Sequence, residues 1–136
     1  MVFSQVRPRI IEMKPEHIDA ADGKNSVRVS AGILFSTWRP GSFVDADGAR
    51  DAMLAVQRIS GGKPMPMLSE MTDVEFSAGA RSEFARSSGV LAIAVLGSSP
   101  VDRVVAAATS RATTYPHEFF TSRDAAMAWL KDVVAR

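Results

Sequence analysis

The sequence predicts a single α/β domain with a mixed sheet of about five strands, antiparallel at a hairpin edge and parallel elsewhere, flanked by four helices. Residues 89–97 carry most of this prediction, because they form an apolar run between two glycines, as in a strand buried on both faces. Residues 98–102 follow with a capping serine, a proline at the first helical position and an acidic residue. Phe119-Phe120-Thr121 precedes the last helix in the same way. This alternation of strands and helices is typical of a largely parallel sheet.

The first half of the chain supplies the antiparallel edge. Apolar residues recur at strand spacing between Val27 and Phe35, interrupted by Gly32. Either Gly32 lies inside one long strand, or Ser30-Ala31-Gly32 forms the turn of a hairpin between two strands. We favour the hairpin, because a glycine within a strand weakens its pairing and glycine is common in turns.

Two helices and a strand follow the hairpin. Asp45 or Asp47 caps a first helix that ends at Gly61-Gly62, where glycine accommodates the left-handed conformation of a helix end. Residues 64–70 form the third strand, with the prolines at its start. A second helix then covers residues 77–87.

The last two helices are expected to bury apolar stripes. Thr121, with Asp124 three residues later, resembles a capping box at the start of the last helix. Helical spacing predicts these buried residues: Val101, Val104, Val105 and Ala108 in the third helix, and Ala126, Met127, Trp129, Leu130, Val133 and Val134 in the last.

Composition limits the classes of protein to consider. The 136 residues correspond to one domain, which we expect over residues 27–136, with residues 1–26 as an N-terminal extension. The formal net charge of +1, without a basic stripe, argues against nucleic-acid binding. The chain has no cysteine, which excludes disulfides and cysteine-based zinc sites. The apolar run at 90–96 is too short to span a membrane and the N-terminus lacks a signal-peptide core, so we expect a cytoplasmic protein.

No set of residues assembles a catalytic or metal site in the sequence. His17 and His117 lie far apart and outside any zinc-type spacing. Gly97-Ser98-Ser99-Pro100 lies between a strand and a helix but lacks the second glycine of a nucleophile elbow. We therefore expect a protein that is not an enzyme and binds no cofactor and no metal. The one weak ligand signal is an anion at the helix N-terminus, on Ser98 and Ser99.

Methionine and tryptophan offer a choice between a core and a binding surface. Methionine-rich surfaces adapt to many partners, whereas most of these methionines recur at core-facing spacing, so we favour ordinary core filling. Trp38 closes a strand and Trp129 lies on the stripe of the last helix, and both are expected at a core edge. The methionines concerned are Met53, Met65, Met67, Met71 and Met127.

Several segments together resemble small bacterial STAS/SEC14-like domains. The resemblance covers residues 27–136 and implies a STAS-like α/β fold without enzymatic activity. It rests on these segments: Trp38-Arg39-Pro40-Gly41, Gly61-Gly62, Met67-Leu68-Ser69-Glu70-Met71, Ser77-Ala78-Gly79-Ala80-Arg81, Gly97-Ser98-Ser99-Pro100-Val101-Asp102-Arg103, and Phe119-Phe120-Thr121 before Ala128-Trp129-Leu130.

The resemblance implies two functions. Anti-sigma-factor antagonists of this kind bind a kinase partner and are switched by phosphorylation of a serine in an Asp-Ser-Ser/Thr-Gly motif, where this chain reads Ser77-Ala78-Gly79-Ala80 without the Asp-Ser pair. This likeness implies a regulatory protein-interaction module with a protein partner and no nucleic acid, and a homodimer is compatible with it. Other relatives hold lipids or small ligands, so a small-ligand or lipid-binding SEC14-like domain is the alternative, which a closed apolar cavity would favour.

We expect the interaction site at residues 70–81. The carboxyl ends of strands and the helix N-termini that follow them gather the functional loops of open α/β sheets. Glu70, Asp73 and Arg81 are predicted as charged contacts at the rim of this site. Ser77 either caps the second helix or accepts a phosphate.

Overall fold

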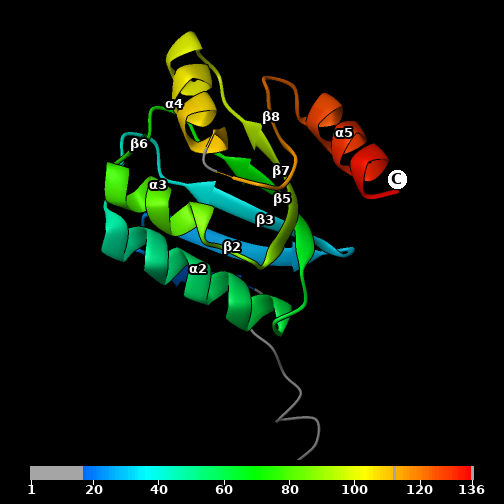
Figure 1. Ribbon diagram of the computed structural model, residues 1–136, viewed down its shortest axis with the longest axis horizontal. Helices are drawn as coiled ribbons and strands as arrows, with labels where there is room; N and C mark the ends of the chain where they lie inside the picture. Colours follow the sequence, from blue (N-terminus) through cyan, green and yellow to red (C-terminus); the bar gives the residue numbers. More distant parts are fainter. Residues whose placement is uncertain (1–16, 112, 136) are drawn as a thin grey trace, which may run out of the picture.

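A mixed six-stranded sheet organises the protein, and the helices pack on its two faces (Figure 1). The computed structural model describes residues 17–111 and 113–135. Its helices are α2 Ala46–Ser60, α3 Ala78–Ala85, α4 Pro100–Ser110 and α5 Arg123–Ala135. Its strands are β1 His17–Ala20, β2 Asn25–Ser30, β3 Ile33–Trp38, β4 Phe43–Val44, β5 Met65–Glu70, β6 Glu75–Phe76, β7 Val90–Leu96 and β8 His117–Phe120.

The sheet is antiparallel at one edge and parallel across the rest. The strand order is β1-β2-β3-β5-β7-β8, and the antiparallel pairs are those of β2 with β1 and β3. Each parallel neighbour is reached through a crossover helix, α2, α3 or α4. The predicted α/β architecture, with a hairpin edge and flanking helices, is confirmed. Strand β1 and a separate parallel pair of β4 with β6 are additions to the predicted elements.

The sheet begins upstream of residue 27, the predicted start of the domain. His17 pairs with Arg28, and Ala20 pairs with Asn25, in antiparallel register. Strand β1 is only 4 residues long, too short for its alternation of polar and apolar residues to stand out in the sequence. Residues 1–16 of the predicted extension lie outside the described residues.

The predicted hairpin joins β2 to β3. Ser30 pairs with Ile33, and the two residues between them, Ala31 and Gly32, have φ angles of 52° and 79°. Two left-handed residues form the tight turn whose twist matches that of antiparallel strands. Gly32 adopts this conformation without a steric cost, which explains the glycine at this position.

Helix α2 is fixed at both ends by the residues that the sequence indicates. Asp45 is the cap, since its Oδ1 accepts a hydrogen bond of 2.8 Å from the backbone N–H of Gly48. Asp47 lies in the first turn instead and pairs with Arg50. Gly61 ends the helix in the left-handed conformation, with φ 65°.

The two faces of the sheet carry separate hydrophobic cores. The larger core lies between one face and helices α2, α3 and α4, with Val27, Leu34 and Val56 among its fully buried residues. The smaller core lies on the other face under α5, around Leu68 and Leu130. Figure 1 shows α5 apart from the other helices. None of the helices within residues 17–111 and 113–135 is long and apolar enough to cross a lipid bilayer.

The predicted buried stripe of α4 is wrong for Val101 and Val104, while Val105 packs against the larger core. Val101 and Val104 are 65% and 67% exposed, whereas Asp102 and Ala106 are buried. The helix is therefore rotated from the orientation that places its valines inside. The physical reason is the carboxylate of Asp102, which the hydrogen-bond donors of two neighbouring loops hold on the inner side of the helix.

Helix α5 packs through Ala126 and Leu130 as predicted, but Val134, which is also predicted to be buried, is 46% exposed. The helix is capped by another residue than the one predicted. Ser122, and not Thr121, accepts a hydrogen bond from the N–H of Ala125 through its hydroxyl, because α5 begins at Arg123. Leu130 is fully buried, and Trp129 is half-buried with its ring 5.7 Å from that of Phe120. Trp129 therefore lies at a core edge, as expected.

The carboxylate of Asp102 joins two loops at the carboxyl ends of β5 and β7. Asp102 is 1% exposed. Its Oδ1 accepts a hydrogen bond of 2.8 Å from the N–H of Asp73, and its Oδ2 accepts one of 2.9 Å from the N–H of Ser98. The backbone N–H of Asp102 donates to the hydroxyl of Ser99, which caps α4. One side chain thus connects the start of α4 to the loop after β5.

These contacts set the pKa of Asp102. Burial favours the neutral form and raises the pKa, but hydrogen bonds from Ser98, Asp73 and Ser99 favour the carboxylate and outweigh it, so the pKa lies below its usual value. A carboxyl group with a lowered pKa in the folded state stabilises the fold above its unfolded pKa of about 4. That stabilisation is lost as the pH falls through the folded pKa.

Replacement of Leu130 by alanine is expected to lower the free energy of unfolding by about 2–5 kcal/mol, because it opens a cavity in the core under α5. Val134→Ala, on the same helix but at an exposed position, is the control and is expected to change stability by less than about 0.5 kcal/mol. Urea unfolding followed by circular dichroism measures both. Equal losses for the two variants would contradict the packing of α5 described above.

Asp102→Asn is expected to lower the free energy of unfolding at pH 7 by about 1–3 kcal/mol, since an amide cannot accept all the hydrogen bonds of the carboxylate. The difference from the wild type is expected to narrow below about pH 4, where the wild-type carboxyl group takes up its proton. Urea unfolding between pH 7 and pH 2.5 tests this, with Asp47→Asn as an exposed control. A difference that stays constant over this pH range would refute the role assigned to the charge.

Candidate functional site

Most of the predicted interaction residues at 70–81 already have partners within the fold. Glu70, at the end of β5, forms an ion pair with Arg123 at the start of α5. The Ser77 hydroxyl caps α3, accepting a hydrogen bond of 3.0 Å from the N–H of Ala80. Arg81 donates to the backbone carbonyl of Phe76 at 2.6 Å. That these residues contact a protein partner stays a prediction.

The remaining predicted residues lie around the carboxylate of Asp102. Asp73 has a positive φ of 54° and an exposed side chain, while its N–H is bound to that carboxylate. The N–H and hydroxyl of Ser98 are both directed to Oδ2 of Asp102, at 2.9 and 3.3 Å, and the Ser99 hydroxyl caps α4. An external anion on Ser98 and Ser99 would have to compete with this internal carboxylate.

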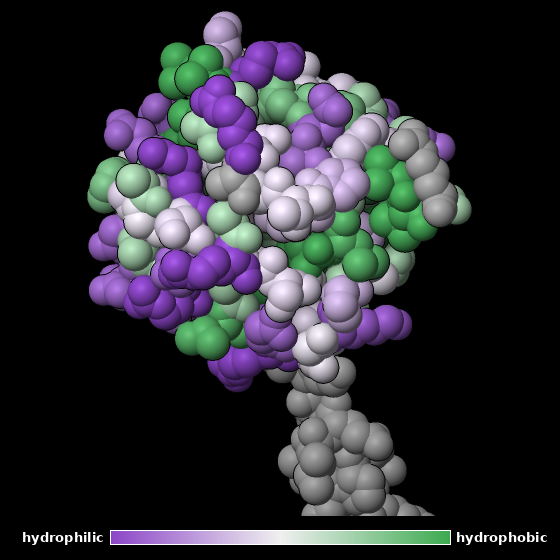
Figure 2. All heavy atoms as spheres, viewed as in Figure 1, coloured by the Kyte–Doolittle hydropathy of each residue, from purple (hydrophilic) through white to green (hydrophobic). Residues whose placement is uncertain are grey.

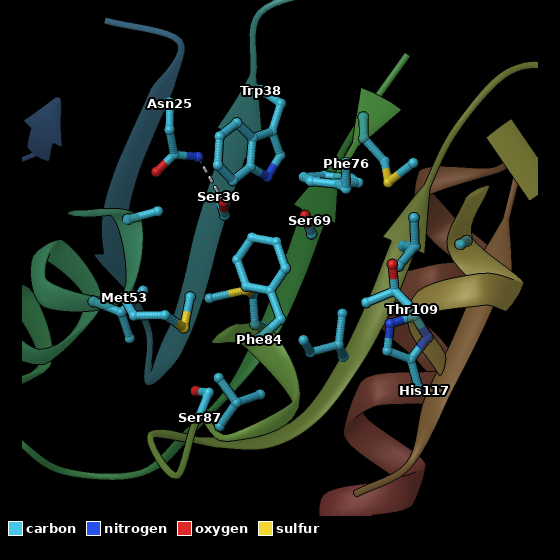
Figure 3. A pocket seen from close by; sticks show the side chains of 18 of the residues that line it. Asn25, Ser36, Trp38, Met53, Ser69, Phe76, Phe84, Ser87, Thr109 and His117 are labelled. Carbon is cyan, nitrogen blue, oxygen red and sulfur yellow. Dashed lines mark hydrogen bonds between the residues drawn. The ribbon is translucent and has the colours of Figure 1, made fainter. Parts of the chain in front are cut away.

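The sequence prediction does not include a cavity on the inner face of the sheet, between the strands and helices α2, α3 and α4 (Figure 3). Its volume is about 50 Å³, and its wall is mainly apolar. It lies within the larger core, where α3 and α4 leave space above the strands. A cavity needs a volume of about 10–15 Å³ to hold one water molecule, so this cavity is larger than a gap left by imperfect packing.

Aromatic and methionine side chains form one part of the cavity wall. The rings of Trp38, Phe76 and Phe84 contact one another edge to face, with centroids 5.4–6.2 Å apart and interplanar angles of 79–86°. Three of the methionines that we assigned to core filling, Met53, Met67 and Met71, also line the cavity. They belong to the core and to the cavity wall at once.

A strip of three polar side chains crosses the floor of the cavity. Asn25 on β2, Ser36 on β3 and Ser69 on β5 are all buried and line the cavity (Figure 3). Ser36 and Ser69 are direct neighbours in the parallel pairing of their strands. The strip therefore results from the strand register and lies on rigid elements of the sheet.

Asn25 has hydrogen-bonding capacity left over. Its Nδ2 donates to the hydroxyl of Ser36 at 3.0 Å and to the carbonyl of Thr37 at 3.3 Å. Among the described residues nothing pairs with its Oδ1, which is buried. The amide cannot simply be reversed, because its oxygen would then face the carbonyl oxygen of Thr37. The hydroxyl of Ser69 also makes no hydrogen bond to the described part of the chain.

Tyr115 and His117 lie on the cavity wall near β8. Their rings stack, with centroids 6.4 Å apart and an interplanar angle of 28°. Burial raises the pKa of Tyr115 to about 12 and lowers the pKa of His117 to about 4, because both charged forms are disfavoured away from water. Both side chains are therefore neutral at pH 7.

The cavity is lined by apolar and neutral polar side chains. Among residues 17–111 and 113–135, no aspartate, glutamate, lysine or arginine lines it. Across the part of the chain that the structure describes, no cluster of three or more histidine, cysteine, aspartate or glutamate side chains is arranged to hold a metal ion. The wall offers apolar contact and neutral polar groups, which include the amide of Asn25, the side chain of His117, and the hydroxyls of Ser36, Ser69, Ser87, Thr109 and Tyr115.

A signal for this cavity is present in the sequence. Strand β3 places Leu34, Ser36 and Trp38 on one face, and strand β5 places Met67 and Ser69 on the same face. A serine among large apolar residues on a core-facing stripe indicates local space or a buried polar role. Sequence reasoning missed it because the two serines become neighbours only through the pairing of β3 with β5.

Comparison with known proteins supports the fold and leaves the function open. No curated protein matches the chain. The fold is similar to that of an uncharacterised protein of the DUF3478 family from Shewanella loihica PV-4, whose crystal structure is described as having a SpoIIAA-like fold. The TM-score is 0.57 at 14% sequence identity, over 87% of this chain and 98% of that one. The predicted resemblance to STAS-like domains is thus confirmed for the fold.

A family model described as a domain of unknown function (DUF7793) matches residues 27–134, which is most of the chain. The chain therefore belongs to the DUF7793 family and has a SpoIIAA-like α/β fold.

Proposed function

We propose that this domain binds a small, mainly apolar molecule in the cavity between the sheet and helices α2, α3 and α4, and that it is not an enzyme. The observation that carries the proposal is an apolar cavity whose floor retains a buried polar strip, Asn25, Ser36 and Ser69. Ligand pockets commonly combine an apolar, aromatic wall with a few polar groups that orient the bound molecule. This favours the ligand-binding alternative implied by the STAS/SEC14-like resemblance.

The composition of the wall supports the non-enzymatic part of the proposal. General acid–base catalysis needs a group whose pKa lies near the working pH. The titratable side chains in the lining are Tyr115 and His117, whose pKa values of about 12 and about 4 both lie far from 7. Within the described lining, no carboxylate accompanies either side chain to form a catalytic pair.

The size of the cavity argues for a ring-sized ligand over a lipid chain. An apolar cavity of about 150 Å³ accommodates one benzene molecule. The cavity here, about 50 Å³, must therefore widen when a ring enters. Met53 and Phe84 are only partly buried, and methionine side chains adapt readily to new neighbours, so these side chains are expected to move aside.

The proposal is tested by ligand-observed NMR with one- and two-ring probes, phenol, toluene and indole, combined with native mass spectrometry for co-purified molecules. The wild type is expected to bind at least one probe. Ser69→Val, which fills the floor without removing a hydrogen bond, is expected to keep its stability and to bind about 5–150 times more weakly, from a steric cost of about 1–3 kcal/mol.

Thr37→Val is the matched control, because it makes the same type of change on β3 at an exposed position outside the cavity. It is expected to bind the probes like the wild type. The proposal fails if the wild type binds no probe and co-purifies with none, or if Ser69→Val binds as tightly as the wild type.

A regulatory protein-interaction module is the second candidate. The observation that favours it is the exposed apolar face of α4, where Val101 and Val104 lie one turn apart. In Figure 2, green hydrophobic atoms lie at the upper end of this helix. The exposed side chain of Asp73 belongs to the loop that Asp102 ties to the same helix, which supplies a charged neighbour for a protein partner.

The two valines provide the test of this second candidate. A Val101→Lys, Val104→Lys double variant is expected to unfold within about 0.5 kcal/mol of the wild type, because both positions are exposed. In a pull-down with quantitative mass spectrometry, it is expected to lose partners that the wild type captures. Leu54→Lys, an exposed apolar position on α2, is the control. Capture of the same proteins by the double variant and the wild type would exclude this face as the site.

A further inference from the structure

We infer that the ligand of the sheet cavity is a neutral molecule that donates an N–H or O–H hydrogen bond to Oδ1 of Asn25, so that Asn25 determines specificity. This inference rests on the proposed function and specifies the chemistry of its ligand. It depends on one atom, since Asn25 is 1% exposed and its Oδ1 lacks a partner among the described residues. A buried acceptor that lacks a partner destabilises the fold, and nearly all such atoms in folded proteins are paired.

The geometry determines which kind of group the ligand must present. The Asn25 amide nitrogen donates to two acceptors, the carbonyl of Thr37 and the hydroxyl of Ser36, and Figure 3 shows the bond to Ser36. The oxygen of the same amide can only accept a hydrogen bond, so an ether or ketone on the ligand would leave it unpaired. The hydroxyls of Ser36 and Ser69 can each donate or accept, and they impose no such demand.

The charge of the lining determines that the ligand is neutral. In the part of the chain that the structure describes, no cationic or anionic side chain lines the cavity, and the titratable residues that do, Tyr115 and His117, are neutral at pH 7. A charged ligand would lose its hydration without gaining an ion pair, at a cost that hydrogen bonds to neutral side chains do not offset.

The test compares phenol with toluene and benzoate, which share a ring and differ in the donor and the charge. The wild type is expected to bind phenol at least about ten times more tightly than toluene, and to bind benzoate more weakly than phenol, because a site with a buried acceptor discriminates against a ligand that lacks the donor. Asn25→Leu is expected to remove the preference for phenol. Gln57→Leu, which removes an exposed amide on α2, is expected to retain it.

A second measurement does not depend on whether Asn25→Leu folds. Asn25 is the only asparagine in the chain, so selective ¹³C labelling of asparagine gives one side-chain carbonyl signal. Phenol is expected to shift this signal and toluene to leave it in place, because only phenol can donate to Oδ1. Figure 3 shows the amide nitrogen turned to Ser36 and the oxygen on the opposite side of the amide.

The outcomes separate this inference from the proposed function. If phenol and toluene bind equally and the asparagine signal does not move, the cavity binds ligands but the role of Asn25 is wrong. If benzoate binds as tightly as phenol, the neutrality of the ligand is wrong. If none of the three probes binds, both the proposed function and the inference are overturned.

Discussion

The structure depends on the two neighbouring inner strands β5 and β7, whose alternate side chains must fill two separate cores. On the face under α5, β7 presents Ala92 and Ala94, and these small side chains let the helix approach the sheet closely. On the other face, β5 presents Met67 and Ser69, above which α3 and α4 stand apart. The sheet is therefore closely packed where α5 covers Ala92 and Ala94 of β7, whereas the opposite face retains a cavity.

The carboxylate of Asp102 sets the position of α4 and, with it, one wall of the cavity. Helix α4 is rotated so that this carboxylate meets the N–H groups of Asp73 and Ser98. The rotation directs Ala106 and Thr109 to the cavity and leaves Val104 in solvent. A hydrogen-bonded buried charge thus outweighs the burial of two valines, each of which would contribute about 1.5–2 kcal/mol.

Sequence reasoning predicted the parts of the fold that local chemistry determines. The hairpin at Gly32, the helix end at Gly61 and the apolar run of β7 each follow from a few adjacent residues. The rotation of α4 could not be predicted in this way. The spacing of apolar residues favours burial of the valines, but it carries no information on the N–H groups of Asp73 and Ser98 that bind the Asp102 carboxylate.

The cavity lay beyond sequence reasoning for a related reason. Its polar strip comes from three strands, and the neighbours Ser36 and Ser69 are brought together only by strand pairing. The predicted residues at 70–81 have clear roles in the sequence as caps and charged loop residues. In the structure, Ser77 and Arg81 form hydrogen bonds with residues close to them in the sequence. Glu70 pairs with Arg123, which belongs to a distant helix, so this contact could not be read from the local sequence.

The location of the polar strip has a consequence for how such a domain could diversify. Ser36 and Ser69 lie at inward positions of rigid strands, and no loop, cap or turn depends on their side chains. Exchange of serine for alanine, threonine or valine at these two positions would change what the cavity accepts and leave the backbone as it is. Two proteins of this fold could therefore share nearly every structural contact and still recognise different molecules.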